Sequence, residues 1–238
     1  MPTHNEELIM GIDEAGRGSL IGPMIVAGVV VSEENVKTLG KIGVKDSKKL
    51  SRAARRKLYE LIIKNSKWVG SVYVSPVEID RGNLNKLTFK AICKLVLDAI
   101  EKNGFIKKVL IDNVTGLKEY EVKNEVSRKN PIASKTVFKI EVKADQKYIP
   151  VAAASIVAKV LRDNVIDEYK RKYGVEGSGY PGDRRTREWL SHNKGGIPRQ
   201  IIRLKWKTIE KLGVKNSDLL KYIRGREHAS ESASRGEG

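Results

Sequence analysis

The chain has 238 residues, of which 40% are hydrophobic and 32% are charged, so its composition allows a buried core and excludes global disorder. Its formal net charge of +17 favours a polyanionic partner, either nucleic acid or an anionic membrane surface. The longest apolar run, residues 20–31, is broken by glycine and proline and is far shorter than the roughly 20 residues of a membrane span, which excludes insertion.

Five runs rich in branched apolar residues predict strands at residues 8–13, 24–32, 68–75, 107–113 and 135–145. Capped or amphipathic segments predict helices over residues 51–65, 85–102, 118–128, 150–173, 185–193, 206–212 and 217–223. Strands in succession, followed by strands that alternate with helices, predict an α/β layer fold with a mixed sheet.

The same elements suggest how the chain is organised. We expect a catalytic domain over residues 1–198, a basic helical segment over residues 199–224 packed on it, and a disordered tail over residues 225–238. The basic residues of the segment favour contact with nucleic acid over a merely solvated helix face. The N-terminus has no signal peptide, and the single cysteine, Cys93, lies in an apolar helical pattern and cannot form an internal disulfide. We therefore expect a cytoplasmic monomer.

Three predicted strands end in an aspartate, namely Asp13, Asp112 and Asp145, and Glu14 follows the first of them. If these strands are neighbours, their acids meet at one edge of the sheet, where ligands of open α/β sheets bind. Clustered carboxylates repel one another, and a hard divalent cation, Mg²⁺ or Mn²⁺, compensates best. For Asp112 or Asp145 taken singly, capping of the next helix is at least as good an explanation.

Asp13 and Glu14 are consecutive, and consecutive strand side chains point to opposite faces. They can share a site only if the chain bends nearby, and Gly16 and Gly18 permit such a bend. The spacing of the glycines does not match the dinucleotide-binding fingerprint.

The stretches GIDEAGRGSLIGPM, VKDSKKLS, VLIDN, KADQKYIPVAAASIVAKVLRD and GSGYPGD occur in this order. Over residues 8–206 the chain therefore resembles the ribonuclease HII family of type 2 ribonucleases H, and archaeal members in particular. The resemblance implies an RNase H-like fold, with a mixed five-stranded sheet flanked by helices and a C-terminal helical extension. It also implies an endonuclease that hydrolyses the RNA strand of RNA–DNA hybrids and incises 5′ of single ribonucleotides in duplex DNA.

Carried over by position, the resemblance makes four residues the catalytic, metal-binding acids: Asp13, Glu14, Asp112 and Asp145. These would hold two divalent ions, Mg²⁺ or Mn²⁺, and yield 5′-phosphate and 3′-hydroxyl ends. The substrate contacts that it implies are the loop at the ribonucleotide 2′-OH (Gly16, Arg17, Gly18), a stacking ring (Tyr180), and phosphate contacts (Lys48, Lys49, Ser155, Lys159). Ser19 stands where the family usually has proline. Without the resemblance, Tyr180 reads equally as a loop anchor, and Lys48 and Lys49 as surface lysines.

Other classes of protein remain as alternatives. A basic nucleic-acid-binding protein would use its acids structurally, and a different nuclease of the same fold, such as a junction resolvase, would act on branched DNA. Ribonuclease HIII carries an additional N-terminal domain, for which a motif beginning at residue 11 leaves no room. We expect RNA–DNA hybrids and ribonucleotide-containing duplexes as partners. We expect no sliding-clamp binding through the tail, because it lacks the paired aromatic residues that some family members use.

Overall fold

The computed structural model describes residues 7–44, 50–113, 116–214 and 216–217. The chain forms two compact units, each assembled from separate segments. The first comprises Met1–Ala15, Ile25–Val74 and Asn83–Leu161, and the second comprises Gly16–Met24, Ser75–Gly82 and Arg162–Gly238.

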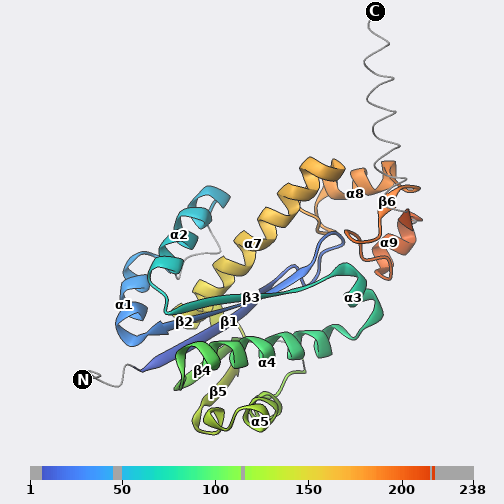
Figure 1. Ribbon diagram of the computed structural model, residues 1–238. Helices are drawn as coiled ribbons and strands as arrows, with labels where there is room; N and C mark the ends of the chain where they lie inside the picture. Colours follow the sequence, from blue (N-terminus) through green and yellow to red (C-terminus); the bar gives the residue numbers. More distant parts are fainter. Residues whose placement is uncertain (1–6, 45–49, 114–115, 215, 218–238) are drawn as a thin grey trace, which may run out of the picture. The chain divides into compact units, whose positions relative to one another are not determined.

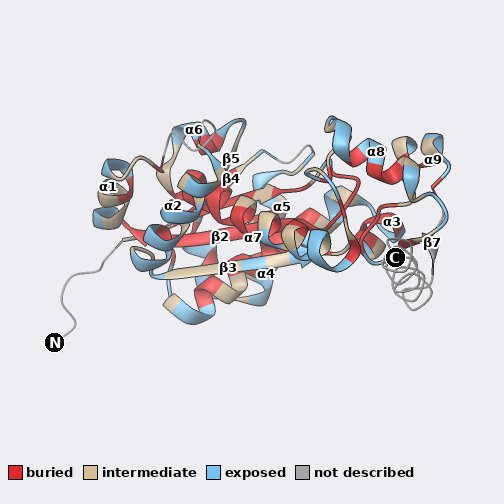
Figure 2. Cartoon of the chain, turned by 90° about the horizontal axis from the view of Figure 1, so that it is seen from above, coloured by how far each residue is buried: buried red, intermediate tan, exposed pale blue. Residues whose placement is uncertain are grey.

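A five-stranded sheet with the order β3-β2-β1-β4-β5 forms the centre of the first unit (Figure 1). The strands are β1 (Leu8–Ala15), β2 (Met24–Ser32), β3 (Trp68–Val74), β4 (Lys108–Asp112) and β5 (Val137–Glu141). β1 is antiparallel to β2 but parallel to β4, and β4 is parallel to β5. The sheet is therefore mixed, as the sequence predicts, and β2 is buried along its whole length (Figure 2).

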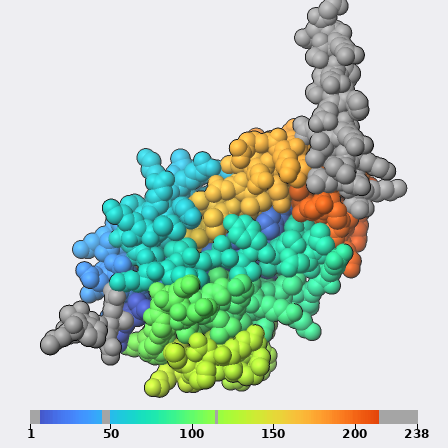
Figure 3. All heavy atoms as spheres, in the orientation of Figure 1, coloured from blue at the N-terminus to red at the C-terminus, as the bar shows by residue number. Residues whose placement is uncertain are grey.

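Helices cover both faces of this sheet. Against one face pack α1 (Glu33–Lys41), α2 (Arg52–Lys64) and the first-unit part of α7 (Ile149–Tyr173), in a core that includes alternate residues of β2. Against the other face packs α4 (Leu84–Asn103), whose Leu95 approaches Gly28 beside Met10. The atoms of α5 (Glu119–Lys129) border those of α4 on the surface (Figure 3).

Gly11 allows α7 to approach the sheet closely. A Cβ atom at this position of β1 would lie 2.1 Å from the carbonyl carbon of Pro150, in the first turn of α7. Only a residue without a side chain fits there. The odd-numbered residues of β1, including Asp13, therefore face α7.

The second unit holds α3 (Pro76–Arg81), α8 (Arg184–His192), α9 (Lys207–Leu212) and a two-stranded sheet of β6 (Ile197–Pro198) and β7 (Asn216–Ser217). Its own core brings together apolar residues from its separate segments, among them Leu20, Ile21, Ile166, Trp189 and Ile202.

The predicted helix starts and ends agree with the structure to within two residues where both exist, and Ser51 accepts the cap bond of α2 as its hydroxyl predicts. Cys93 is a free, buried cysteine of α4, which is also confirmed. No helix in the described part of the chain is long and apolar enough to cross a membrane. The helices α1 and α3 were not predicted from the sequence, and neither was α6 (Ala144–Lys147).

Asp13 does not end its strand, because β1 continues to Ala15. Two other predicted elements were also wrong in extent. The strand expected over residues 135–145 is β5 alone, because a 3-10 helix (Pro131–Lys135) precedes it and Lys143 turns the chain with a φ of 56°. Asp145 consequently lies in a short helix, α6 (Ala144–Lys147), and not at a strand end. The helix expected over residues 217–223 falls mostly outside the described residues, and Ser217 belongs to β7.

Candidate active site

Asp13 and Asp112 lie on neighbouring parallel strands of the first unit. Ile12 of β1 pairs with Ile111 of β4, so the aspartates that follow them leave the same face of the sheet. This is the face that packs against α7, because Leu110 contacts Val151 there. Two carboxylates thus lie at the carboxyl ends of adjacent parallel strands.

The environment of Asp13 disfavours its charged form. Only 7% of the residue is exposed. Burial raises the pKa of Asp13 to about 6, and the charge of Asp112 acts in the same direction. A hydrogen bond from Ser155, the backbone N–H of Glu14 at 2.7 Å and the charge of Lys159 oppose the rise in pKa only in part. In the absence of a bound cation, Asp13 is therefore easier to protonate than an exposed aspartate.

Ser155 and Lys159 lie one turn apart on α7, where the Lys159 ammonium donates to the Ser155 hydroxyl at 2.8 Å. Both influence Asp13, so two of the predicted phosphate contacts lie beside a predicted catalytic acid. Lys48 and Lys49, the other two, lie outside the described residues.

Asp112 also connects β4 with the helix that carries Asp145. Its Oδ1 accepts a hydrogen bond of 2.6 Å from the backbone N–H of Ala144, the first residue of α6. Asp112 thus satisfies a helix N-terminus, although not that of the helix next in sequence. Asp145, the following residue, is buried with 5% of its surface exposed.

Glu14 lies on the same strand as Asp13, and β1 stays paired with β2 as far as Ala15. The bend begins at Gly16, where φ is +82°, and so comes after both acids. Among the described residues, no group of three or more histidine, cysteine, aspartate or glutamate side chains is arranged to hold a metal ion. The neighbouring pair Asp13 and Asp112 nevertheless offers the all-oxygen, doubly negative donor set that suits a hard divalent cation.

The glycine loop that follows β1 begins the second unit. The hydrogen bonds described below join its backbone to other residues of that unit. The N–H of Gly16 donates to the hydroxyl of Tyr180 at 3.0 Å. The guanidinium of Arg203 donates to the carbonyl oxygens of Gly16 at 2.5 Å, of Arg17 at 2.7 Å and of Gly22 at 3.0 Å. The structure thereby brings together two predicted substrate contacts, Gly16 and Tyr180, around an arginine that was not predicted.

Ser19 also holds this loop. Its backbone N–H and its hydroxyl both donate to the Gly16 carbonyl, at 3.3 Å and 3.0 Å. A proline at this position would supply neither bond, since it lacks both the N–H and the hydroxyl. The departure from the family pattern at Ser19 therefore adds contacts to the loop.

Tyr180 is placed by a second buried arginine, Arg162 of α7. The Arg162 guanidinium carbon lies 4.3 Å from the centre of the Tyr180 ring, within the range of a cation–π contact. The same side chain donates to the carbonyl oxygens of Ile21 at 3.3 Å and of Ser178 at 3.0 Å. Tyr180 is thus held at its ring and at its hydroxyl, which the sequence alone does not indicate.

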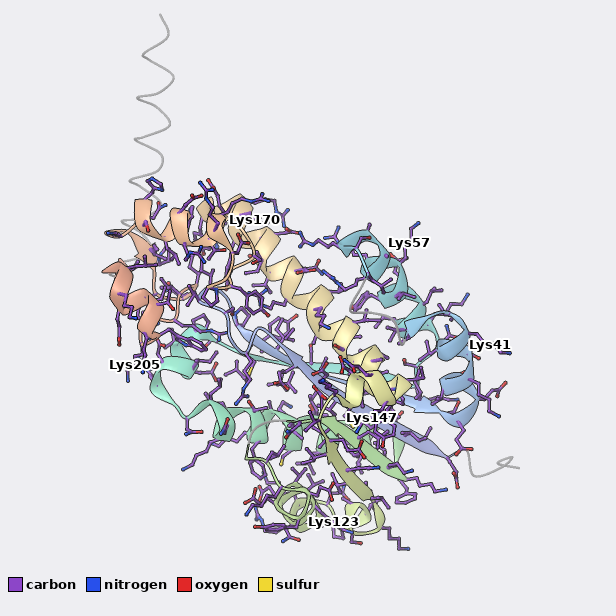
Figure 4. All side chains as sticks on the ribbon, turned by 180° about the vertical axis from the view of Figure 1, so that it is seen from behind. Lys41, Lys57, Lys123, Lys147, Lys170 and Lys205 are labelled. Atoms are coloured by element: carbon purple, nitrogen blue, oxygen red, sulfur yellow. The ribbon has the colours of Figure 1, made fainter. Side chains whose placement is uncertain are left out.

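The basic segment that begins at residue 199 uses part of its charge internally. Arg199 forms an ion pair of 2.8 Å with Asp80 of α3, which is buried and also accepts the N–H of Leu204 at 2.7 Å. Arg203 is fully buried, whereas Lys205, Lys207 and Lys211 are exposed. Exposed lysines are not confined to this segment. Figure 4 labels lysines on several elements, and of these Lys41 on α1 and Lys57 on α2 are exposed.

A groove between α4 and α5 is one of several hollows in the first unit. It is lined by Lys86, Phe89, Cys93, Leu97 and Lys129, together with neighbours on the same helices. None of the residues predicted from the sequence to act in catalysis or binding lines it.

The comparisons with known proteins agree with the fold described above. The family model described as Ribonuclease HII matches residues 10–209. A ribonuclease HII from Sulfurisphaera tokodaii is 44% identical over 207 residues, which cover 86% of this chain and 95% of the relative. The crystal structure of ribonuclease H2 from Pyrococcus horikoshii is 35% identical and superposes with a TM-score of 0.74 over 87% of this chain and 97% of that one. RNase HII from Archaeoglobus fulgidus, solved in complex with PCNA, is 35% identical with a TM-score of 0.72 and covers 90% of this chain and 99% of that one.

A mixed five-stranded sheet with helices on both faces, and with acids at the ends of its central parallel strands, defines an enzyme of the RNase H-like fold. The chain belongs to the ribonuclease HII family. It is accordingly a divalent-metal-dependent endonuclease for the RNA strand of RNA–DNA hybrids.

Proposed function

We propose that this enzyme also incises duplex DNA on the 5′ side of a single embedded ribonucleotide and leaves 5′-phosphate and 3′-hydroxyl ends. The observation that carries the proposal is the pair of neighbouring acids in the first unit, Asp13 and Asp112; in the second unit, Arg203 and Tyr180 hold the glycine loop. In this proposal the acids carry out hydrolysis, and the loop selects the ribonucleotide.

In this proposal Asp13, Glu14, Asp112 and Asp145 hold two divalent ions, Mg²⁺ or Mn²⁺. Such ions activate a water and stabilise the leaving oxygen. The neighbouring acids Asp13 and Asp112 would hold the first ion, because a cation relieves their mutual repulsion. Glu14 and Asp145 would complete the ligand set.

Ser155 and Lys159 are suited to contact the scissile strand. They belong to one face of α7 and lie next to Asp13, where the ammonium can pair with a phosphate. We assign the same role to Lys48 and Lys49. Exposed lysines such as Lys205 then add sequence-independent, salt-sensitive affinity.

Selection of the ribonucleotide falls to Gly16, Arg17 and Gly18, with Tyr180 stacking on the sugar or base beside it. A 2′-OH both donates and accepts hydrogen bonds, and it is the group that distinguishes RNA from DNA at one position. Gly16 must lack a side chain, because a Cβ there would lie 2.6 Å from the Pro23 carbonyl oxygen. In this account the 2′-OH is recognised and does not attack the phosphate.

We further propose that the enzyme acts as a cytoplasmic monomer. The residues in which we predict no clamp-binding motif, 225–238, lie outside the described part of the chain. The complex of the Archaeoglobus protein with PCNA shows that a relative can bind a clamp. Truncation after residue 224 should leave any PCNA binding of this chain unchanged in a pull-down, and loss of binding would contradict the proposal.

The test uses three labelled duplexes of one sequence: an RNA–DNA hybrid, DNA with one ribonucleotide, and DNA alone. Each is incubated with wild type and Asp13→Asn, in Mg²⁺ and in EDTA. We expect wild type to cut the first two duplexes only in Mg²⁺, and the variant to cut none. Cutting of the all-DNA duplex would indicate a structure-specific nuclease, and binding without any cutting would indicate a nucleic-acid-binding protein.

A further inference from the structure

Arg203 is an arginine with no exposed surface, and its hydrogen bonds converge on one loop. All the loop carbonyls that it reaches, those of Gly16, Arg17 and Gly22, come from a segment more than 180 residues earlier in the chain. Burying a guanidinium is costly unless its donors are satisfied. The loop carbonyls satisfy them and are in turn fixed in direction.

Because the peptide bond is planar, fixing the loop carbonyls also fixes the direction of the N–H groups that follow them. In a trans peptide the C=O and the following N–H point in opposite directions. The carbonyl oxygens of Gly16 and Arg17 point at Arg203, so the N–H groups of Arg17 and Gly18 point away from it. Gly18 is exposed, and a Cβ built on it meets no atom within 4 Å. Its amide therefore lies where a substrate can reach it.

The charge of Arg203 persists at neutral pH. Burial, with a smaller effect from the nearby charge of Arg162, lowers its pKa to about 10, whereas Tyr180 and Asp80 oppose the change. A guanidinium presents several donors in a planar fork and can serve several carbonyls at once, whereas a lysine ammonium is a single point of charge. The four hydrogen bonds to three carbonyl oxygens thus account for an arginine at this position.

We infer that Arg203 is a positioning residue for ribonucleotide recognition, holding the loop so that the amides of Arg17 and Gly18 are directed at the 2′-OH or the adjoining phosphate. The inference rests on the proposed function of the loop. Arg203 does not contact the substrate in this account and acts only through the backbone of the loop.

The test compares Arg203→Lys with wild type in binding to two duplexes of one sequence, one with a single ribonucleotide and one of DNA alone, measured in EDTA so that neither is cut. We expect the preference for the ribonucleotide duplex over the all-DNA duplex to fall about tenfold or more in Arg203→Lys, because the lysine cannot make the same set of charge-assisted hydrogen bonds to the loop. Affinity for the all-DNA duplex should change less than about threefold, because exposed lysines set it. The matched control, Arg171→Lys at an exposed position of α7, should change neither value.

An equal loss of affinity for both duplexes, or no loss, would overturn the inference, since either result means that Arg203 is structural only. Wild type that shows no preference for the ribonucleotide would overturn the proposed function, and this is visible without the variant. If Arg203→Lys does not fold, wild type labelled with ¹⁵N-glycine decides the matter. The amide resonance of Gly18 should shift with the ribonucleotide duplex and not with the DNA duplex, and equal shifts would overturn the inference.

Discussion

The hydroxyl of Tyr180 accepts a hydrogen bond of 3.0 Å from the backbone N–H of Gly16, although 164 residues separate the two in sequence. This bond joins the GSGYP loop to the glycine loop within the second unit. Since Arg162 holds the ring and Arg203 holds the glycine loop, the proposed stacking surface and the proposed 2′-OH site are fixed to each other. Recognition of the ribonucleotide then depends on a preformed arrangement of backbone.

Substitutions of Tyr180 should separate the roles of its hydroxyl and its ring. Tyr180→Phe keeps the ring over Arg162 but leaves the Gly16 N–H without its acceptor, which costs about 1 kcal/mol, or about fivefold in kcat/KM. Tyr180→Ala also loses base stacking, a further effect of about 1–3 kcal/mol. Steady-state kinetics on a duplex with one ribonucleotide measures kcat/KM of both variants, and we expect the Ala variant to be more impaired than the Phe variant. If both variants are equally impaired, only the hydroxyl of Tyr180 contributes to activity, contrary to our account.

Asp13→Asn should abolish metal-dependent activity and metal-dependent stabilisation together. Replacement of a direct ligand should reduce cleavage by more than the roughly 10–100-fold typical of residues one shell further from the metal. Mg²⁺ binding to the folded state raises the melting temperature of wild type by mass action. The melting temperature of the variant should rise much less, as measured by calorimetry with and without Mg²⁺. Asp98→Asn, at an exposed acid of α4, is the control, and equal shifts in all three proteins would contradict the role of Asp13.

Asp13 should also make the metal-free protein less stable as the pH rises. Its pKa is about 6 in the folded state against 3.8 for the unfolded group, so the folded state binds the proton more tightly. The free energy of unfolding therefore falls as the pH rises from about 4 to about 6 and stays lower above that, by up to about 3 kcal/mol. Asp13→Asn lacks this titration, so its stability relative to wild type should increase across the same window. Urea unfolding in EDTA between pH 4 and pH 8 measures the difference, and a difference independent of pH would be inconsistent with the environment described for Asp13.

Gly11→Ala should unfold or strongly destabilise the protein. The new Cβ would lie 2.1 Å from the Pro150 carbonyl carbon, and backbone atoms of a packed helix cannot move aside cheaply. We expect a loss of about 3 kcal/mol or more in the free energy of unfolding. Gly195→Ala is the control, because a Cβ there meets nothing within 4 Å. Equal stability of the two variants would show that α7 does not depend on this close approach.

The sequence predicts the sheet well because its branched apolar runs are long and bounded by turns, as in β2. It also places Asp13 and Asp112 near the carboxyl ends of two strands, and the structure shows that these strands are neighbours, although β1 continues past Asp13 to Ala15. It misplaces Asp145, because the left-handed turn at Lys143, which follows the end of β5, cannot be recognised within a run of alternating apolar and charged residues.

Arg162 and Arg203 were not predicted as functional for a different reason. Arg203 is one of many basic residues in its segment and Arg162 lies in a helical segment of mixed charge, and only the fold shows that these two are buried. Their partners are backbone carbonyls far away in sequence, which carry no signal in residue identity. The residues that hold the recognition loops therefore had to come from the structure.

The most direct test of the account is the chemistry of the cleaved ends. A duplex with one ribonucleotide is labelled at either end of the cut strand, digested in Mg²⁺, and its products are resolved beside standards. We predict a single cut on the 5′ side of the ribonucleotide, with a 3′-hydroxyl on the upstream product and a 5′-phosphate on the ribonucleotide, because the 2′-OH is recognised while the acids carry out hydrolysis. A cut on the 3′ side that leaves a 2′,3′-cyclic phosphate would show that the 2′-OH attacks the phosphate, and it would contradict the account.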